Sequence, residues 1–91
     1  MELKEQIIND INNNPIILYM KGNKDQPRCG FSAKVVNILN RYSVVYHDVN
    51  IFEDPEIRIK LSEHSNWPTI PQLFVNGELI GGCDIVTELD S

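Results

Sequence analysis

A short, continuous apolar run is the feature that most constrains how this chain can fold. Residues 16–20 read Ile-Ile-Leu-Tyr-Met, with no charged side chain among them. A short run of this kind is typical of a β-strand that is covered on both faces, as strands are in a parallel sheet. The run is also far too short to cross a bilayer, so the sequence predicts no membrane span.

A helix and a second strand follow this run. From Cys29 onward, the apolar positions Val35, Leu39 and Tyr42 recur at helical spacing. Residues 44–49 are rich in β-branched side chains and predict a strand. A strand, a helix and a strand within about 30 residues form a βαβ unit, whose crossover is almost always right-handed.

Local signals of period, capping and turn chemistry predict the remaining elements. These elements are helices at 3–12, from Asp54-Pro55 onward and at 85–90 after Cys83-Asp84, and hairpin strands at 72–75 and 78–80 joined by Asn76-Gly77. The sequence therefore predicts an α/β fold with one four-stranded mixed sheet, parallel in its first half, antiparallel in its second and flanked by helices. At 91 residues, the chain is expected to form a single domain over 1–91.

The charge distribution is acidic for the whole chain but basic around one cysteine. The net charge of −5 argues against nucleic acid as a partner, because phosphate binding needs a basic face. Between residues 21 and 34 only Asp25 opposes a group of basic side chains. The basic residues there are Lys21, Lys24, Arg28 and Lys34. This local excess fits either a small anionic ligand near Cys29 or a solvated loop, and charge alone does not separate the two.

The two cysteines, Cys29 and Cys83, do not make a disulfide framework. Free thiols point to a reducing compartment, and the acidic N-terminal segment does not resemble a signal or transit peptide. We therefore expect a cytoplasmic protein, or one of a mitochondrial or plastid matrix if it is eukaryotic and processed.

Cys29 is the candidate reactive residue. It is expected at the first turn of a helix, where unpaired N–H groups and the helix dipole favour a thiolate over a thiol. Such surroundings, with Arg28 adjacent in the sequence, lower a thiol pKa from about 8.5 to roughly 3.5–7.5. The alternative is an inert, buried cysteine, but Pro27, Arg28 and Gly30 are not typical neighbours of a core residue.

The residue one helical turn beyond Cys29 is Ser32, in the place where a C-x-x-C redox pair carries its second sulfur. A serine cannot close a disulfide. Any redox cycle at Cys29 must then use an external thiol or Cys83.

Three separated motifs resemble those of a known family. They are Cys29-Gly30-Phe31-Ser32, Trp67-Pro68-Thr69-Ile70-Pro71 and Gly81-Gly82-Cys83-Asp84. In this order they are similar to the motifs of the monothiol glutaredoxins of the C-G-F-S class, a bacterial and organellar family. The similarity runs from about Ile7 to the last residue, and it implies the thioredoxin-like fold of that family.

The resemblance implies a glutathione groove beside Cys29, which would be the catalytic thiol. The implied glutathione contacts are Lys21 and Arg58 for the glycyl carboxylate, the backbone of Ile70 before a cis Pro71 for the cysteinyl part, and Cys83 with Asp84 for the γ-glutamyl end. The chemistry is consistent, because Lys and Arg suit carboxylates and the N–H groups of a helix start suit an anion. The Asp84 carboxylate would suit the ammonium group.

The resemblance also implies a [2Fe-2S] cluster shared between two subunits. Each subunit would supply the Cys29 thiolate and the thiolate of one bound glutathione, which together make four sulfur ligands. A homodimer joined through the cluster would receive it from iron–sulfur scaffold proteins and pass it to recipient proteins. BolA-type proteins would be further partners. Such a carrier acts in iron–sulfur cluster assembly and redox homeostasis, with at most weak oxidoreductase activity.

Two other functions stay open at this point. One is a glutathione-dependent thiol–disulfide oxidoreductase, in which Cys29 removes glutathione from mixed disulfides. The resemblance weighs against it, because the loop between Lys21 and Cys29 is longer than in dithiol glutaredoxins, which is a hallmark of weak reductases. The other is a regulatory binding module for BolA-type proteins. Cys83 would be either a backbone contact to glutathione or a partner in disulfide exchange.

The sequence departs from the family at two places. The final helix of the family is longer than 85–90, so a shortened last helix is expected, with a possible cost to stability and dimer packing. Position 70 is often aromatic in bacterial relatives. Ile70 keeps the backbone role but changes the surface of the groove.

Overall fold

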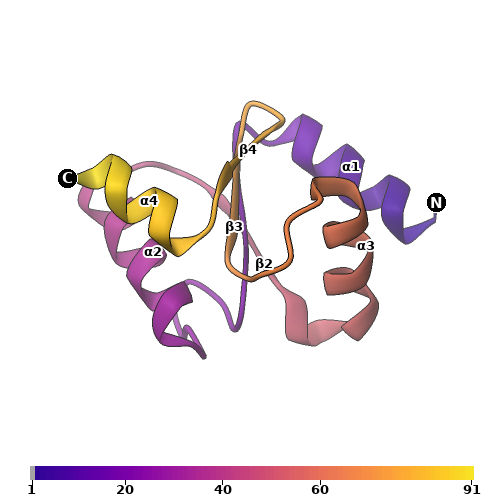
Figure 1. Ribbon diagram of the computed structural model, residues 1–91, viewed down its shortest axis with the longest axis horizontal. Coiled ribbons are helices and arrows are strands. Elements are labelled where there is room, and N and C mark those ends of the chain that lie inside the picture. Colours follow the sequence, from indigo (N-terminus) through magenta and orange to yellow (C-terminus); the bar gives the residue numbers. More distant parts are fainter. Residues whose placement is uncertain (1) are drawn as a thin grey trace.

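A computed structural model describes residues 2–91 as a four-stranded sheet between two layers of helices (Figure 1). The elements in chain order are α1 (Leu3–Asn13), β1 (Ile16–Met20), α2 (Gly30–Arg41), β2 (His47–Asn50), the 3-10 turn η1 (Ile51–Glu53), α3 (Pro55–Ser65), β3 (Gln72–Val75), β4 (Glu78–Gly81) and α4 (Cys83–Asp90). The helices α2 and α4 cover one face of the sheet, and α1 and α3 cover the other. The predicted α/β fold with a mixed sheet is confirmed.

The sheet is built around β1, which pairs on both sides. The strand order is β2-β1-β3-β4. β1 runs parallel to β2, with Ile17 opposite His47, and antiparallel to β3, with Ile17 opposite Phe74. The predicted parallel first half and antiparallel hairpin are both present.

The apolar run of β1 supplies both halves of the core. Successive side chains of a strand point to opposite faces, so Leu18 and Met20 pack under α2 and α4, whereas Ile17 and Tyr19 pack under α1 and α3. All four side chains are fully buried. A strand covered on both faces has no position for a polar residue, which explains the uninterrupted apolar run.

The start of α3 has the predicted chemistry. The Asp54 side chain accepts a hydrogen bond from the Glu56 N–H at 2.9 Å, and Pro55 occupies the first helical position. The helix ends at Ser65, and the left-handed backbone of the next residue, Asn66 (φ 59°), closes the last turn. Asparagine tolerates this conformation better than most side chains do.

The second strand is shorter than predicted. The sequence pattern predicts a strand over 44–49, but β2 begins only at His47, and Val45 is 93% exposed. In the parallel register, the residue opposite Val45 would be Pro15, which precedes β1 and has no N–H to donate. A β-branched residue without a neighbouring strand cannot form the hydrogen-bond ladder of a sheet. Strand propensity alone therefore predicts too early a start for β2.

The last helix, α4, runs from Cys83 to Asp90, so its predicted start is confirmed. Its end is fastened to α2 by the Asp90 carboxylate. This carboxylate forms an ion pair with Arg41 and accepts a hydrogen bond from the Tyr42 hydroxyl at 2.7 Å. Both partners hold the pKa of Asp90 below its usual value, and Tyr42 is the larger cause.

Within residues 2–91, no helix has the length and apolar character that a membrane crossing requires.

We expect buried and exposed β-branched residues near β1 and β2 to differ sharply in their contribution to stability. Ile17→Ala should lower the free energy of unfolding by about 2–5 kcal/mol, because it removes buried methyl groups and leaves a cavity. Val45→Ala should change it by no more than about 0.5 kcal/mol. Urea denaturation of both variants measures the difference. A large loss in Val45→Ala would mean that this residue belongs to the sheet after all.

Candidate functional site

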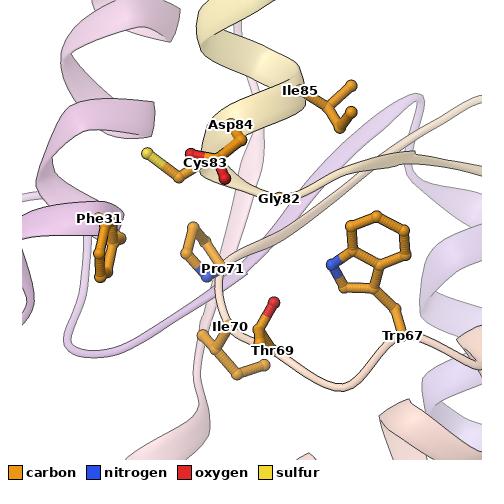
Figure 2. A pocket seen from close by; sticks show the side chains of 9 residues that line it. All are labelled: Phe31, Trp67, Thr69, Ile70, Pro71, Gly82, Cys83, Asp84 and Ile85. Atoms are coloured by element: carbon orange, nitrogen blue, oxygen red, sulfur yellow. The ribbon is translucent and has the colours of Figure 1, made fainter.

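A cavity of about 200 Å³ opens where α2, the loop before β3 and the start of α4 meet. Figure 2 shows Phe31 on one side of it and Trp67 on the other, with Pro71 between them and the start of α4 above. The residues that line it are Phe31, Trp67, Thr69, Ile70, Pro71, Gly82, Cys83, Asp84 and Ile85. Its walls are mostly apolar, and Asp84 is its one charged group.

Cys29 lies next to this cavity as the N-cap of α2, with an extended backbone and a half-buried side chain. The backbone N–H of Ser32 is the main cause that lowers the pKa of Cys29. The N–H of Phe31, the Lys21 ammonium and the Ser32 hydroxyl act in the same direction, and only partial burial opposes them. The helix start therefore stabilises a thiolate, as the sequence predicts.

Ser32 has a structural role that the sequence reasoning missed. Its side chain is fully buried, and its hydroxyl accepts a hydrogen bond from the Lys21 N–H at 3.1 Å. This bond joins the end of β1 to the first turn of α2. Ser32 is thus more than the residue that replaces a second sulfur, because it fixes the helix that carries Cys29.

The loop between Lys21 and Cys29 is held in place at several points. The Arg28 N–H donates to the Lys21 carbonyl at 2.8 Å, which closes the loop at its base. Gly22 has a left-handed backbone (φ 86°), and a Cβ there would lie 2.4 Å from the Gln26 carbonyl oxygen. Only glycine fits this close approach.

Lys24 ties the same loop to the sheet. Its N–H donates to the Asp48 carboxylate, and its ammonium donates to the Tyr46 carbonyl, both at 2.9 Å. The ammonium also lies 4.4 Å from the centre of the Tyr46 ring. Lys24 is therefore engaged within the fold. By contrast, Lys21, Arg28 and Lys34 form no ion pair within the part of the chain that the structure describes.

The loop before β3 carries the predicted cis peptide bond between Ile70 and Pro71, which is confirmed. The side-chain amide of Gln72 donates to the Trp67 and Thr69 carbonyls, each at 3.0 Å. Gln72 is fully buried, so its amide anchors the loop from inside the fold. The sequence reasoning missed this anchor, because a glutamine at the start of a strand gives no local signal.

The start of α4 comes close to this loop because Gly82 has no side chain. A Cβ on Gly82 would lie 3.1 Å from the Pro71 carbonyl oxygen and 3.3 Å from the Trp67 indole nitrogen. Gly82 is the N-cap of α4, and no side chain caps the helix. The first N–H groups of α4 are therefore left for a ligand, next to the exposed carboxylate of Asp84.

The predicted site residues fall into three groups. Ile70, Cys83 and Asp84 line the cavity. Cys29 does not line it but lies two residues before the wall residue Phe31, and Lys21 is close enough to Cys29 for its charge to lower the pKa of the thiol. Arg58 is exposed on α3 and does not line the cavity.

Phe31 and Thr69 are wall residues that the sequence reasoning did not assign. Both belong to the motifs that carry the family resemblance, and that signal could have found them. The Cys83 sulfur lies 3.9 Å from the Thr87 hydroxyl, and neither cysteine is in a disulfide.

Residues 2–91 bring too few metal-ligating side chains together for a complete metal site. Among residues 2–91, no three His, Cys, Asp or Glu side chains lie together in a way that could hold a metal ion. Any metal centre at Cys29 would need further ligands from outside the chain.

The chain is similar to known glutaredoxins in sequence and in structure. The family profile described as Glutaredoxin matches residues 16–80. A protein named probable monothiol glutaredoxin 2 from Rickettsia felis is 56% identical over 85 residues, which are 93% of this chain and 82% of that protein. The solution structure of reduced poplar apo GrxS14 matches with a TM-score of 0.84 at 44% identity, over 97% of this chain and 81% of that chain.

A more distant neighbour supports the fold alone. The crystal structure of a buckwheat glutaredoxin–glutathione complex matches with a TM-score of 0.83 at 24% identity, over 94% of this chain and 76% of that chain. The predicted thioredoxin-like fold is therefore confirmed by close and distant relatives alike.

The lowered pKa of Cys29 should be visible in its alkylation by iodoacetamide. Only the thiolate reacts, so the rate at Cys29, followed by peptide mapping, should rise at a lower pH than for free cysteine. Because folding lowers this pKa, the ionised thiol stabilises the fold above the pKa of the unfolded thiol. That stabilisation is lost as the pH falls through the folded pKa.

Ser32→Ala should raise the Cys29 pKa slightly and lower the free energy of unfolding by about 1–3 kcal/mol, since the Lys21 N–H loses its partner. Ser62→Ala, on α3, is the matched control and should change neither quantity. An unchanged stability of Ser32→Ala would contradict the anchoring role.

Proposed function

The chain belongs to the glutaredoxin family, in its monothiol branch, and we propose that it carries a [2Fe-2S] cluster in iron–sulfur cluster assembly. In this proposal, two subunits hold the cluster between them with the help of two glutathione molecules. The observation that carries it is Cys29, a free, half-buried thiol with a lowered pKa at the start of α2. Buried Ser32 takes the place of a second sulfur, so the thiolate has no partner within its own helix.

Glutathione fits the cavity beside Cys29 by its chemistry. The uncapped N–H groups of Cys83 and Asp84 would bind the γ-glutamyl carboxylate, and the Asp84 carboxylate would bind the ammonium. The Gln72 amide fixes the loop that carries Ile70, through the Trp67 and Thr69 carbonyls, and the Ile70 backbone would pair with the peptide part of glutathione. Lys21 has no ion-pair partner within residues 2–91 and would bind the glycyl carboxylate, with Arg58 as the second candidate.

The cluster would be cargo held at the edge of this cavity. A [2Fe-2S] cluster takes four thiolates, and each subunit has one suitable cysteine at the site. Two Cys29 thiolates and two glutathione thiolates complete the set. Phe31 is 62% exposed beside Cys29, and a methyl group on Gly30 would contact nothing within 4 Å. This open surface leaves room for a second subunit to approach the thiolate.

The residues of the chain would serve transfer as well as binding. The N–H groups of Ser32 and Phe31, which lower the pKa of Cys29, would also stabilise its thiolate when the cluster leaves. Iron–sulfur scaffold proteins would supply the cluster, and recipient proteins would take it. BolA-type proteins would replace one subunit. We place this function in the bacterial cytoplasm or in an organelle matrix, where free thiols persist.

Removal of glutathione from mixed disulfides is the second candidate, and the lowered Cys29 pKa favours it. The Cys29 thiolate would attack the glutathione sulfur of a protein–glutathione disulfide, so that a new disulfide forms and the protein thiolate leaves with a proton from solvent. A second glutathione thiolate would then attack the glutathione sulfur on Cys29. This step restores the Cys29 thiolate and releases glutathione disulfide.

Anaerobic reconstitution with iron, sulfide and glutathione tests the cluster proposal. We expect visible absorbance and a doubling of the molecular mass with the parent chain, and neither with Cys29→Ala. Cys83→Ser should keep the chromophore, because the Cys83 contact is assigned to its backbone. A chromophore in the Cys29→Ala variant would contradict the cluster proposal. Rapid turnover of a glutathionylated peptide without cluster formation would favour the second candidate.

Asp84→Asn tests the glutathione contacts separately from the cluster. We expect the affinity for S-methylglutathione, measured by NMR titration, to fall about twofold to fivefold, as is typical for an exposed ion pair. Glu88→Gln, one turn further along α4 and outside the cavity lining, is the matched control and should bind as the parent does. Equal losses in both variants would point to a general charge effect.

A further inference from the structure

A second, larger cavity lies in the other helix layer, between α1, β2 and α3. Its volume is about 350 Å³, compared with about 200 Å³ beside Cys29. In Figure 1, this layer is on the opposite side of the sheet from α2, so the cavity is separate from the thiol site. A single water takes up about 30 Å³ of liquid, so the space exceeds what one bridging water needs. It falls in the range of ligand pockets.

Tyr19 lies against this cavity and has an unsatisfied polar group. Its side chain is 1% exposed, and its hydroxyl has no hydrogen-bond partner within residues 2–91. The ring is held edge-on against Phe74, with 5.9 Å between the ring centres, so the hydroxyl cannot easily turn elsewhere. Burial, and then the charge of Asp10, raise the pKa of Tyr19. The hydroxyl therefore stays protonated and can both donate and accept a hydrogen bond.

The rim of the cavity is acidic. Asp10 of α1 and Glu53 of η1 both line it, and neither carboxylate has an ion-pair partner within the described part of the chain. The third lining carboxylate, Asp48, is already bound by Lys24. No lysine or arginine lines the cavity, and its one imidazole, His47, is exposed on β2.

The other walls combine polar side chains, from Gln6, His47 and Asn50, with apolar ones. Leu3 and Ile7 of α1 face the cavity from one side, and Ile57 of α3 faces it from another. An apolar wall suits a hydrocarbon stem, whereas the two carboxylates and the Tyr19 hydroxyl suit a positively charged head group. A bare metal ion is a poor fit, because no three potential metal ligands lie together within residues 2–91.

We propose that this cavity binds an organic cation, namely a primary ammonium or guanidinium group on a short apolar stem. The head group sits between Asp10 and Glu53 and donates a hydrogen bond to the Tyr19 hydroxyl oxygen. The stem packs on Leu3, Ile7 and Ile57. The cation is either a free amine or the side chain of a lysine or arginine on a partner protein, and both present the same chemistry.

An NMR titration of the isotopically labelled chain with n-butylguanidinium tests the site. We expect saturable shifts confined to the lining residues of the cavity, on α1, β1, β2, η1 and α3, with a dissociation constant of about 1–10 mM, as suits a ligand of this size. n-Butylurea has the same stem and no charge, and it should bind at least about fivefold more weakly. Equal binding of the two compounds, or no saturation, would overturn the proposal. Water alone would then fill the cavity.

Three variants define which groups hold the cation. Asp10→Asn should weaken binding of n-butylguanidinium about fivefold, and Tyr19→Phe about threefold. Glu5→Gln, which is exposed on α1 and outside the lining, should have no effect. Tyr19→Phe removes a buried hydroxyl without a partner, so its resistance to urea should equal or exceed that of the parent chain. If Tyr19→Phe is less stable in urea but binds n-butylguanidinium as the parent chain does, the hydroxyl stabilises the fold and has no role in binding.

Two further ligands separate the possible sources of the cation. A short, neutral-flanked peptide with one arginine represents a partner protein, and agmatine represents a free amine. Tighter binding of the peptide would identify a docking site for a basic side chain, and tighter binding of agmatine would identify a small-molecule site. If neither the peptide nor agmatine binds, and n-butylguanidinium does not bind either, an organic cation is excluded as the ligand of this cavity. None of these measurements depends on cluster formation at Cys29.

Discussion

The rest of the structure depends on β1, a strand with neighbours on both edges and helices on both faces. Its alternating side chains divide the core into two halves. The end of the strand continues into Lys21, whose backbone N–H is bound by the Ser32 hydroxyl. The position of the reactive thiol is therefore tied to the end of this strand by the Ser32 bond and by the Arg28 N–H, which donates to the Lys21 carbonyl. Tyr19, one residue before the end of the strand, faces the opposite helix layer.

Much of the fold could be predicted because its signals are local. The Asp54-Pro55 helix start and the Asn76-Gly77 turn each follow from a few neighbouring side chains. The start of β2 could not be predicted in this way. Val45 has the preference of a strand residue, but the chain opposite it is Pro15, and a ladder needs a donor on both sides. Local preference was overruled by the lack of a partner.

The candidate site was predicted where its residues fall in recognisable motifs, as Cys29, Ile70 and Asp84 do. The supports of that site were not predicted. Ser32 and Gln72 are buried polar residues, and the partners of both are backbone groups that lie next to them only after folding. The cavity at Tyr19 was missed for the same reason, since three elements distant in sequence combine to form it.

Lys24 also occupies one edge of the sheet, at β2. β2 is an edge strand, and the free backbone groups of such a strand can pair with another molecule. Lys24 binds the Tyr46 carbonyl where the chain enters β2, and its charge lies against Asp48 within the strand. A foreign strand would have to break these contacts and bury the charges before it could pair. The loop that frames the thiol thus also opposes pairing at this edge of the sheet.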